Sequence, residues 1–276
     1  MRLGVNLRTT PGVASMFVSP QRLFAEMLDL GIDGTQILPM KGMDFGEICR
    51  IARQRDALLL FEDAWNAVPG FWYSIKHLRG AAGMTSTIKD WVVSPRPEAC
   101  DEMVSQMARH GLTQVCHNFK SVTDPERQFV EVSPRLCLNA SELVERCLAT
   151  GIKLVIDSKH IIGLPPDRTI PVRAIGRNYA EKQFRYCKDI VQYLANNGVL
   201  APIFHLNSTG TETEIGIPML GYRGAYLLDR WCSFWPDEVE KLVVLEFSPK
   251  LWPARASRQR IIDLVQMTRQ GLVPDC

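Results

Sequence analysis

The chain lacks most features that mark membrane, secreted or nucleotide-binding proteins. No run of about 18 consecutive apolar residues occurs, so no transmembrane helix is predicted. The eight cysteines form no C-x-x-C pair, which indicates reduced thiols rather than a disulfide framework. Neither G-x-G-x-x-G nor P-loop spacing is present. The first residues lead into a strand pattern without a signal segment, so we expect a cytoplasmic location.

Strong charge of either sign is also missing. The net charge of +2 comes from 32 basic and 30 acidic residues that are interspersed, and no basic run could follow a phosphate backbone. We therefore expect neither nucleic acid nor a membrane as partner, but a small-molecule substrate, and leave assembly into a homo-oligomer open. Apolar residues make up 46% of the chain, enough to bury a large core.

Eight short apolar runs alternate with longer segments of helical period, the pattern of parallel strands joined by crossover helices. A barrel of this kind needs about 250 residues. The sequence therefore predicts one α/β domain, residues 1–276, folded as a (β/α)8 TIM barrel. The expected strands are residues 3–7, 34–38, 57–62, 113–119, 128–132, 153–157, 202–206 and 242–247.

The connections between these strands differ in length. Helices are predicted over residues 21–30, 141–150 and 179–197, each followed by a glycine that ends it. Only residues 120–127 separate the fourth and fifth strands, too few for a full crossover helix, so the fourth βα unit is shortened. Long insertions at residues 66–97 and 161–177 are candidate lids over the mouth of the barrel.

Polar residues end several strands, and in a parallel barrel such residues point toward one shared mouth. Carboxylates and imidazoles together suit a divalent metal such as Mn²⁺, Mg²⁺, Co²⁺ or Zn²⁺, and no cysteine stands at these ends. The acidic and histidine candidates are His117, Glu131, Asp157, His160, His205 and Glu246. Candidates for contacts with substrate hydroxyls are Asn6, Arg8, Gln36 and Asn207.

Each of these residues also has an ordinary structural explanation. An isolated acid after a strand more often caps a helix or pairs with a base, and a lone histidine is more often a satisfied core residue than a ligand. Their joint occurrence nevertheless favours a metal site, because each of the last five strands presents an Asp, Glu or His at the same end of the predicted barrel.

The order Glu131, Asp157-x-x-His160, His205, Glu246 resembles the xylose isomerase-like barrel superfamily, which includes sugar isomerases and epimerases, inosose dehydratases and repair nucleases of the endonuclease IV type. The resemblance implies a metal held by Glu131, Asp157, His205 and Glu246. It also implies that His160 and His117 serve a second metal or support the first ligands.

Two departures from that pattern affect the expected function. The repair nucleases carry further histidines, whereas the third strand here ends in Phe61-Glu-Asp and residues 207–214 contain no histidine, which disfavours a three-zinc phosphodiesterase. Lys159 replaces the small residue often found inside Asp-x-x-His, and it either contacts an anionic substrate or lies on the surface.

The resemblance implies an isomerase or epimerase acting on a sugar or another small polyhydroxy carbonyl compound. The metal would polarise the carbonyl as a Lewis acid, and Glu131 and Glu246 would move a proton to and from carbon through an enediolate. A lyase or dehydratase on the same enediolate remains open, as do the phosphodiesterase and a barrel that binds without catalysis.

Overall fold

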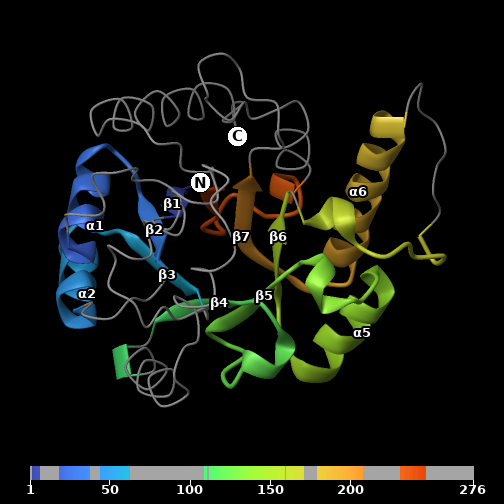
Figure 1. Cartoon of the computed structure of the whole chain (residues 1–276), viewed down its shortest axis with the longest axis horizontal. Helices are drawn as coiled ribbons and strands as arrows, with labels where there is room; N and C mark the ends of the chain where they lie inside the picture. The colour runs from blue at the N-terminus through green and yellow to red at the C-terminus, as the bar shows by residue number, and fades with distance from the viewer. Residues whose placement is uncertain are drawn as a thin grey trace, which may run out of the picture. The chain divides into compact units, whose positions relative to one another are not determined.

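The computed structural model describes residues 2–6, 19–37, 44–62, 109–110, 112–158, 160–170, 179–207 and 231–246. Eight strands hydrogen-bond in chain order, β1 to β8, as a closed barrel (Figure 1). This arrangement confirms the predicted fold class. The strands are β1 (Arg2–Asn6), β2 (Gly34–Ile37), β3 (Leu58–Glu62), β4 (Thr113–Cys116), β5 (Gln128–Glu131), β6 (Leu154–Asp157), β7 (Leu200–Asn207) and β8 (Leu242–Glu246).

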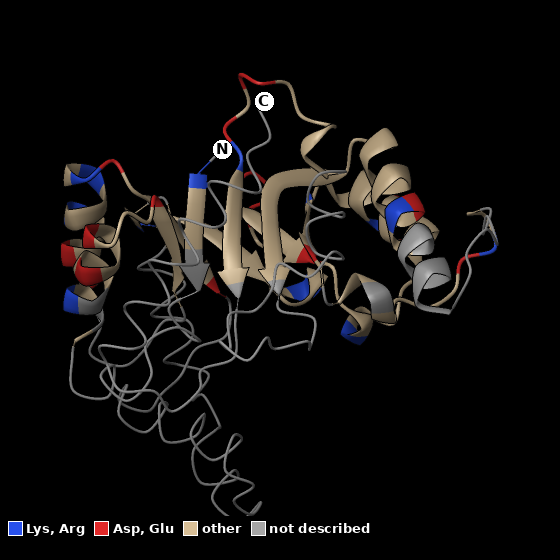
Figure 2. Cartoon of the chain, turned by 90° about the horizontal axis from the view of Figure 1, so that it is seen from above, with Lys and Arg blue, Asp and Glu red and all other residues tan. Residues whose placement is uncertain are grey.

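Each described α-helix lies in the sequence between the two strands that it connects. These helices are α1 (Pro20–Asp29), α2 (Phe45–Gln54), α5 (Ala140–Thr150) and α6 (Tyr179–Asn196). Charged residues of both signs lie mainly on helices and loops, while the strands are largely uncharged (Figure 2). This division is expected where strands are covered on both faces. No helix among the described residues is long and apolar enough to cross a membrane.

The chain divides into two compact units. The N-terminal unit comprises residues 3–114 and 246–269, and the C-terminal unit comprises residues 1–2, 115–245 and 270–276. The prediction of a single domain stays a prediction.

In the N-terminal unit, local signals set the starts of α1 and α2. Ser19 accepts a hydrogen bond from the backbone N–H of Arg22 and so caps α1, which begins with a proline. Asp44 caps α2 by accepting from the backbone N–H of Glu47 at 2.9 Å. β2 and β3 pair in parallel, with Gly34 opposite Leu58.

In the C-terminal unit, α5 begins with a capping box. The Asn139 side chain accepts from the backbone N–H of Glu142, and the Glu142 carboxylate accepts from the backbone N–H of Asn139. Gly151 ends α5 with a φ of 74°, a left-handed conformation that glycine adopts without strain. The helix is therefore fixed at both ends between β5 and β6.

The shortened fourth unit is confirmed. Between β4 and β5 the chain forms only a single-turn 3₁₀ helix, Phe119–Ser121. The Asn118 side chain caps it, accepting from the backbone N–H of Ser121 at 3.0 Å. This cap also ends β4 at Cys116, so the prediction that strand four runs to Phe119 is wrong by three residues.

The two long insertions were predicted as candidate lids. The first, residues 66–97, lies outside the described residues. The second begins with a 3₁₀ helix, Ile161–Gly163, and is described as far as Ile170.

The pairing of β6 with β7 is irregular at one point. Leu154 lies opposite Leu200, but Ile156 lies opposite Phe204, so β7 carries two extra residues within this stretch. Pro202 falls inside the extra segment, where its missing N–H costs no regular ladder bond. Beyond the irregularity, Asp157 lies opposite His205. β7 curves along its length (Figure 1).

The close approach of β2 and β3 makes a testable stability prediction. A Cβ added at Gly34 would lie 2.6 Å from the backbone oxygen of Leu58, which cannot move without disturbing the sheet. We expect Gly34→Ala to lower the free energy of unfolding by about 1–3 kcal/mol in urea titrations.

The matched control is the same substitution at Gly46 in α2. There the nearest atom to an added Cβ is a side-chain oxygen, Asp44 Oδ1 at 3.3 Å, and not a backbone atom, and alanine favours helix. Gly46→Ala should be neutral or stabilising by up to about 1 kcal/mol. Equal losses in both variants would contradict the close-approach explanation.

Candidate metal centre

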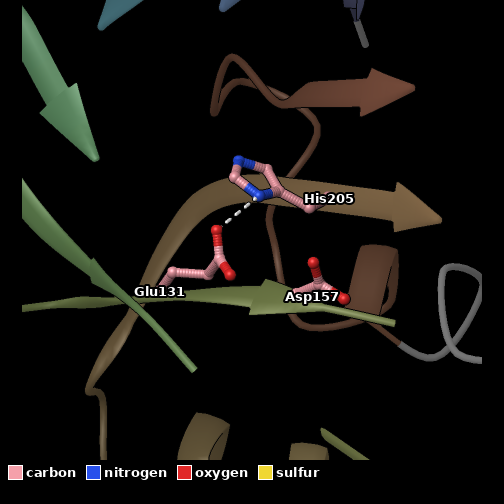
Figure 3. Close-up of side chains that lie close together, drawn as sticks. All are labelled: Glu131, Asp157 and His205. Atoms are coloured by element: carbon pink, nitrogen blue, oxygen red, sulfur yellow. Dashed lines mark ion pairs between the residues drawn. The ribbon is translucent and has the colours of Figure 1, made fainter. Parts of the chain in front are cut away.

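Three buried side chains from neighbouring strands meet in the C-terminal unit. Glu131 ends β5, Asp157 ends β6 and His205 lies near the end of β7. One potential ligand atom from each lies within 4.8 Å of the other two. Figure 3 shows the two carboxylates and the imidazole converging from the three strands. We call these three residues the triad.

Strand geometry explains why the triad meets. Glu131 lies opposite Val155, so Asp157, two residues further along β6, projects from the same face as Glu131. His205 lies directly opposite Asp157 across the β6–β7 pairing. All three side chains therefore share one face at the carboxyl ends of adjacent parallel strands.

His160 connects the two carboxylates of the triad. Its backbone N–H donates to Asp157 Oδ1 at 2.9 Å, and its Nδ1 lies 2.8 Å from Glu131 Oε1. The spacing Asp-x-x-His thus forms a turn after β6 that folds the imidazole back over Glu131. The side chain of His160 remains 31% exposed, whereas that of Glu131 is buried.

The charge of Glu131 is set by burial and by its histidine neighbours. Burial raises the pKa of Glu131, but hydrogen bonding with His160 and His205 and the positive charges of His205 and His117 together outweigh that effect. The pKa of Glu131 therefore lies well below its ordinary value, and the group is a carboxylate at neutral pH. Its Oε2 lies 3.2 Å from Nδ1 of His205 (Figure 3).

The donor set fits a divalent metal. Two buried carboxylates and one imidazole offer the oxygen and nitrogen ligands that Mn²⁺, Co²⁺, Zn²⁺ or Mg²⁺ accept. Two carboxylates placed together and away from water also require a compensating positive charge. In the described structure the imidazoles of His160 and His205 lie against Glu131.

The structure brings together Glu131, Asp157, His205 and His160 from the residues predicted from sequence. His117 lies just beyond β4, half-buried, and acts on Glu131 through its charge. The side chain of Glu246, which closes β8, is not among those described. The same holds for the side chains of Asn6 and Asn207, while Arg8 and Lys159 lie outside the described residues altogether.

One buried acid was not selected from the sequence. Glu62 ends β3, and its oxygen Oε1 accepts a hydrogen bond from the side-chain amide of Gln36 at 3.2 Å. The signal was present, because Glu62 follows the apolar run Leu58–Phe61 as Asp157 follows its own strand. It was missed because the motif covers only the last four strands.

No family model matches the chain, and comparison with curated protein sequences also gives no match. Among solved structures, a sugar phosphate isomerase/epimerase from Parabacteroides distasonis is similar, at 9% identity over 99% of this chain and 100% of that one, with a TM-score of 0.48. An AP endonuclease of family 2 from Brucella melitensis is 15% identical over 91% of this chain and 94% of that one, with a TM-score of 0.39.

An organophosphorus hydrolase from Deinococcus radiodurans is 9% identical over 98% of this chain and 86% of that one, with a TM-score of 0.32. The names of these three proteins describe different activities. At such identities and scores, the chemistry of this chain has to follow from its own residues.

The triad makes a direct prediction about metal binding. Asp157→Asn keeps the volume and the oxygen that accepts from His160, but removes one anionic ligand. We expect calorimetric titration of the chelator-treated protein with Mn²⁺ to show binding to the wild type, and affinity weaker by on the order of 100-fold in Asp157→Asn.

Asp167 provides the matched control. It is also buried, but its carboxylate accepts from the backbone N–H groups of Ser141 at 2.6 Å and Thr169 at 2.8 Å, a role in chain packing. Asp167→Asn should bind Mn²⁺ as the wild type does. Unchanged affinity in Asp157→Asn would refute the triad as the metal centre.

A second prediction concerns His160 as a positioning residue. His160→Ala removes the contact that orients Glu131 Oε1 and should weaken Mn²⁺ binding by about 10- to 100-fold. His160→Asn, whose amide nitrogen can occupy the position of Nδ1, should recover part of that loss in the same titration. If alanine and asparagine behave alike, His160 does not act by orienting Glu131.

Proposed function

We propose that this protein is a divalent-metal-dependent isomerase or epimerase acting on a sugar or another small polyhydroxy carbonyl compound. The observation that carries the proposal is the convergence of Glu131, Asp157 and His205, with ligand atoms within 4.8 Å of one another, at the carboxyl ends of three barrel strands. That is the end of a parallel barrel where substrates are bound.

A divalent metal bound by the triad would supply Lewis acidity toward a carbonyl and its neighbouring hydroxyl, which acidifies the C–H of the hydroxyl-bearing carbon beside the carbonyl. Asp157 would hold the centre together with His205, while the N–H of His160 keeps its Oδ1 in place. Both oxygens of Glu131 already contact imidazoles. This engagement favours Glu131 as a ligand. Glu246, the last acid of the sequence motif, is the proposed proton carrier.

The composition of the site favours this chemistry over phosphodiester hydrolysis. Among the described residues, the triad is the one group of at least three potential ligands, and it contains a single histidine. His160 and His117 lie nearby, but β3 ends in Glu62 and not in a histidine. A multinuclear zinc cluster of the repair type needs more imidazoles than these three. A lyase that eliminates a β-hydroxyl from the same enediolate differs only in where the acid lies, and product analysis separates it.

The proposal predicts exchange of carbon-bound hydrogen with solvent. With Mn²⁺ in deuterium oxide, a panel of ketoses and aldoses should include a sugar that gains deuterium beside its carbonyl as it converts to an isomer, followed by proton NMR. Removing the anionic ligand removes the Lewis acid, so Asp157→Asn should lower the rate by on the order of 1,000-fold. Glu246→Gln should lower exchange by at least 100-fold.

The control is Asp167→Asn, which should exchange at the wild-type rate. Formation of a dehydrated product would reassign the enzyme as a lyase. Nicking of abasic DNA at physiological salt, with no deuterium incorporation into any sugar, would refute the proposed function.

A further inference from the structure

A second buried polar pair lies in the N-terminal unit, at the ends of β2 and β3. Gln36 is 1% exposed and Glu62 is 2% exposed. Gln36 lies opposite Leu60, so Glu62, two residues further along β3, projects from the same face as Gln36. The amide nitrogen of Gln36 donates to Glu62 Oε1 at 3.2 Å.

The pair projects from the side of the sheet that faces away from α2. Ile37 and Phe61 are register partners on the opposite face, and the Phe61 ring packs against Phe45 of α2 with ring centroids 5.4 Å apart. In a barrel whose helices lie outside, the face opposite α2 is the inner face. Gln36 and Glu62 are thus inward residues at the carboxyl ends of their strands.

The carboxylate of Glu62 fixes the orientation of the Gln36 amide. A carboxylate only accepts hydrogen bonds, so it attracts the amide NH₂ and repels the amide oxygen. The oxygen Oε1 of Gln36 consequently faces away from Glu62. It is buried, and no group among the described residues donates a hydrogen bond to it. Such an acceptor is costly to bury and is satisfied in most folded proteins.

We propose that Gln36, oriented by Glu62, binds a hydroxyl group of a small polyol. Only a hydrogen-bond donor satisfies Gln36 Oε1, and the adjacent carboxylate disfavours phosphate and carboxylate ligands. A hydroxyl gives up less hydration than an ammonium group when it enters a position this deeply buried. This proposal deepens the sequence prediction that Gln36 contacts a substrate hydroxyl. No residue of the triad takes part, so its test can fail while the proposed function stands, and the reverse.

The test uses the full-length protein, treated with a chelator, and xylitol as the probe in calorimetric titrations. Gln36→Met keeps the side-chain length but removes the acceptor, and the loss of one hydrogen bond should weaken xylitol binding by about tenfold. Glu62→Gln frees the Gln36 amide to rotate and should weaken binding by a smaller factor. Melting curves followed by circular dichroism establish that each variant is folded.

Gln128 is the matched control, because it is buried but already satisfied. Its side-chain oxygen accepts from the backbone N–H of Asp124 at 2.8 Å and also from that of Thr123. Gln128→Met should melt at a lower temperature yet bind xylitol as the wild type does.

Three results would overturn the assignment. Absence of xylitol binding to the wild type would show that the Gln36 oxygen is met by water alone. Wild-type affinity in both Gln36→Met and Glu62→Gln would place the polyol elsewhere. Binding of putrescine but not xylitol, lost in the same variants, would show that the site takes an ammonium group.

Discussion

The contact of one buried carboxylate with two imidazoles is the interaction on which the candidate site depends. Burying Glu131 without a positive partner would favour its protonated form, because desolvation opposes the charge. His160 and His205 reverse that preference by lying against both of its oxygens. Glu131 is therefore kept in the anionic form that a metal ligand requires, although it is buried.

The contacts of Glu131 with its histidine neighbours depend on the helix ends and the turn that position the strands. The capping box and the left-handed Gly151 fix both ends of α5, which links the strands bearing Glu131 and Asp157. The turn after β6 is held by the backbone N–H of His160 on the Asp157 carboxylate. Because Asp157 is at once a potential ligand and the cap of this turn, the local fold and the site share one side chain.

The sequence predicts the barrel and the members of the site better than it predicts their exact placement. Continuous apolar runs identify all eight strands, because strands covered on both faces are apolar along their length and so differ clearly from the polar loops. The end of strand four was misplaced because Asn118 caps a 3₁₀ turn, a side-chain choice that hydrophobicity does not reveal. Glu62 went unselected because it lies on β3, outside the motif of the last four strands, and its contact with Gln36 appears only in the folded chain.

The register of β7 shows most clearly why hydrophobic patterns do not predict the exact positions of the site residues. The seventh strand was expected to begin at Pro202, whereas β7 begins at Leu200 and continues through the proline with an irregular pairing. If the register set by Leu154 and Leu200 continued without the extra residues, Asp157 would lie opposite Ile203 instead of His205. A shift of two residues leaves every side chain on its original face, so period-two patterns cannot detect it. The irregularity around Pro202 is nevertheless what sets His205 opposite Asp157, and with it the triad.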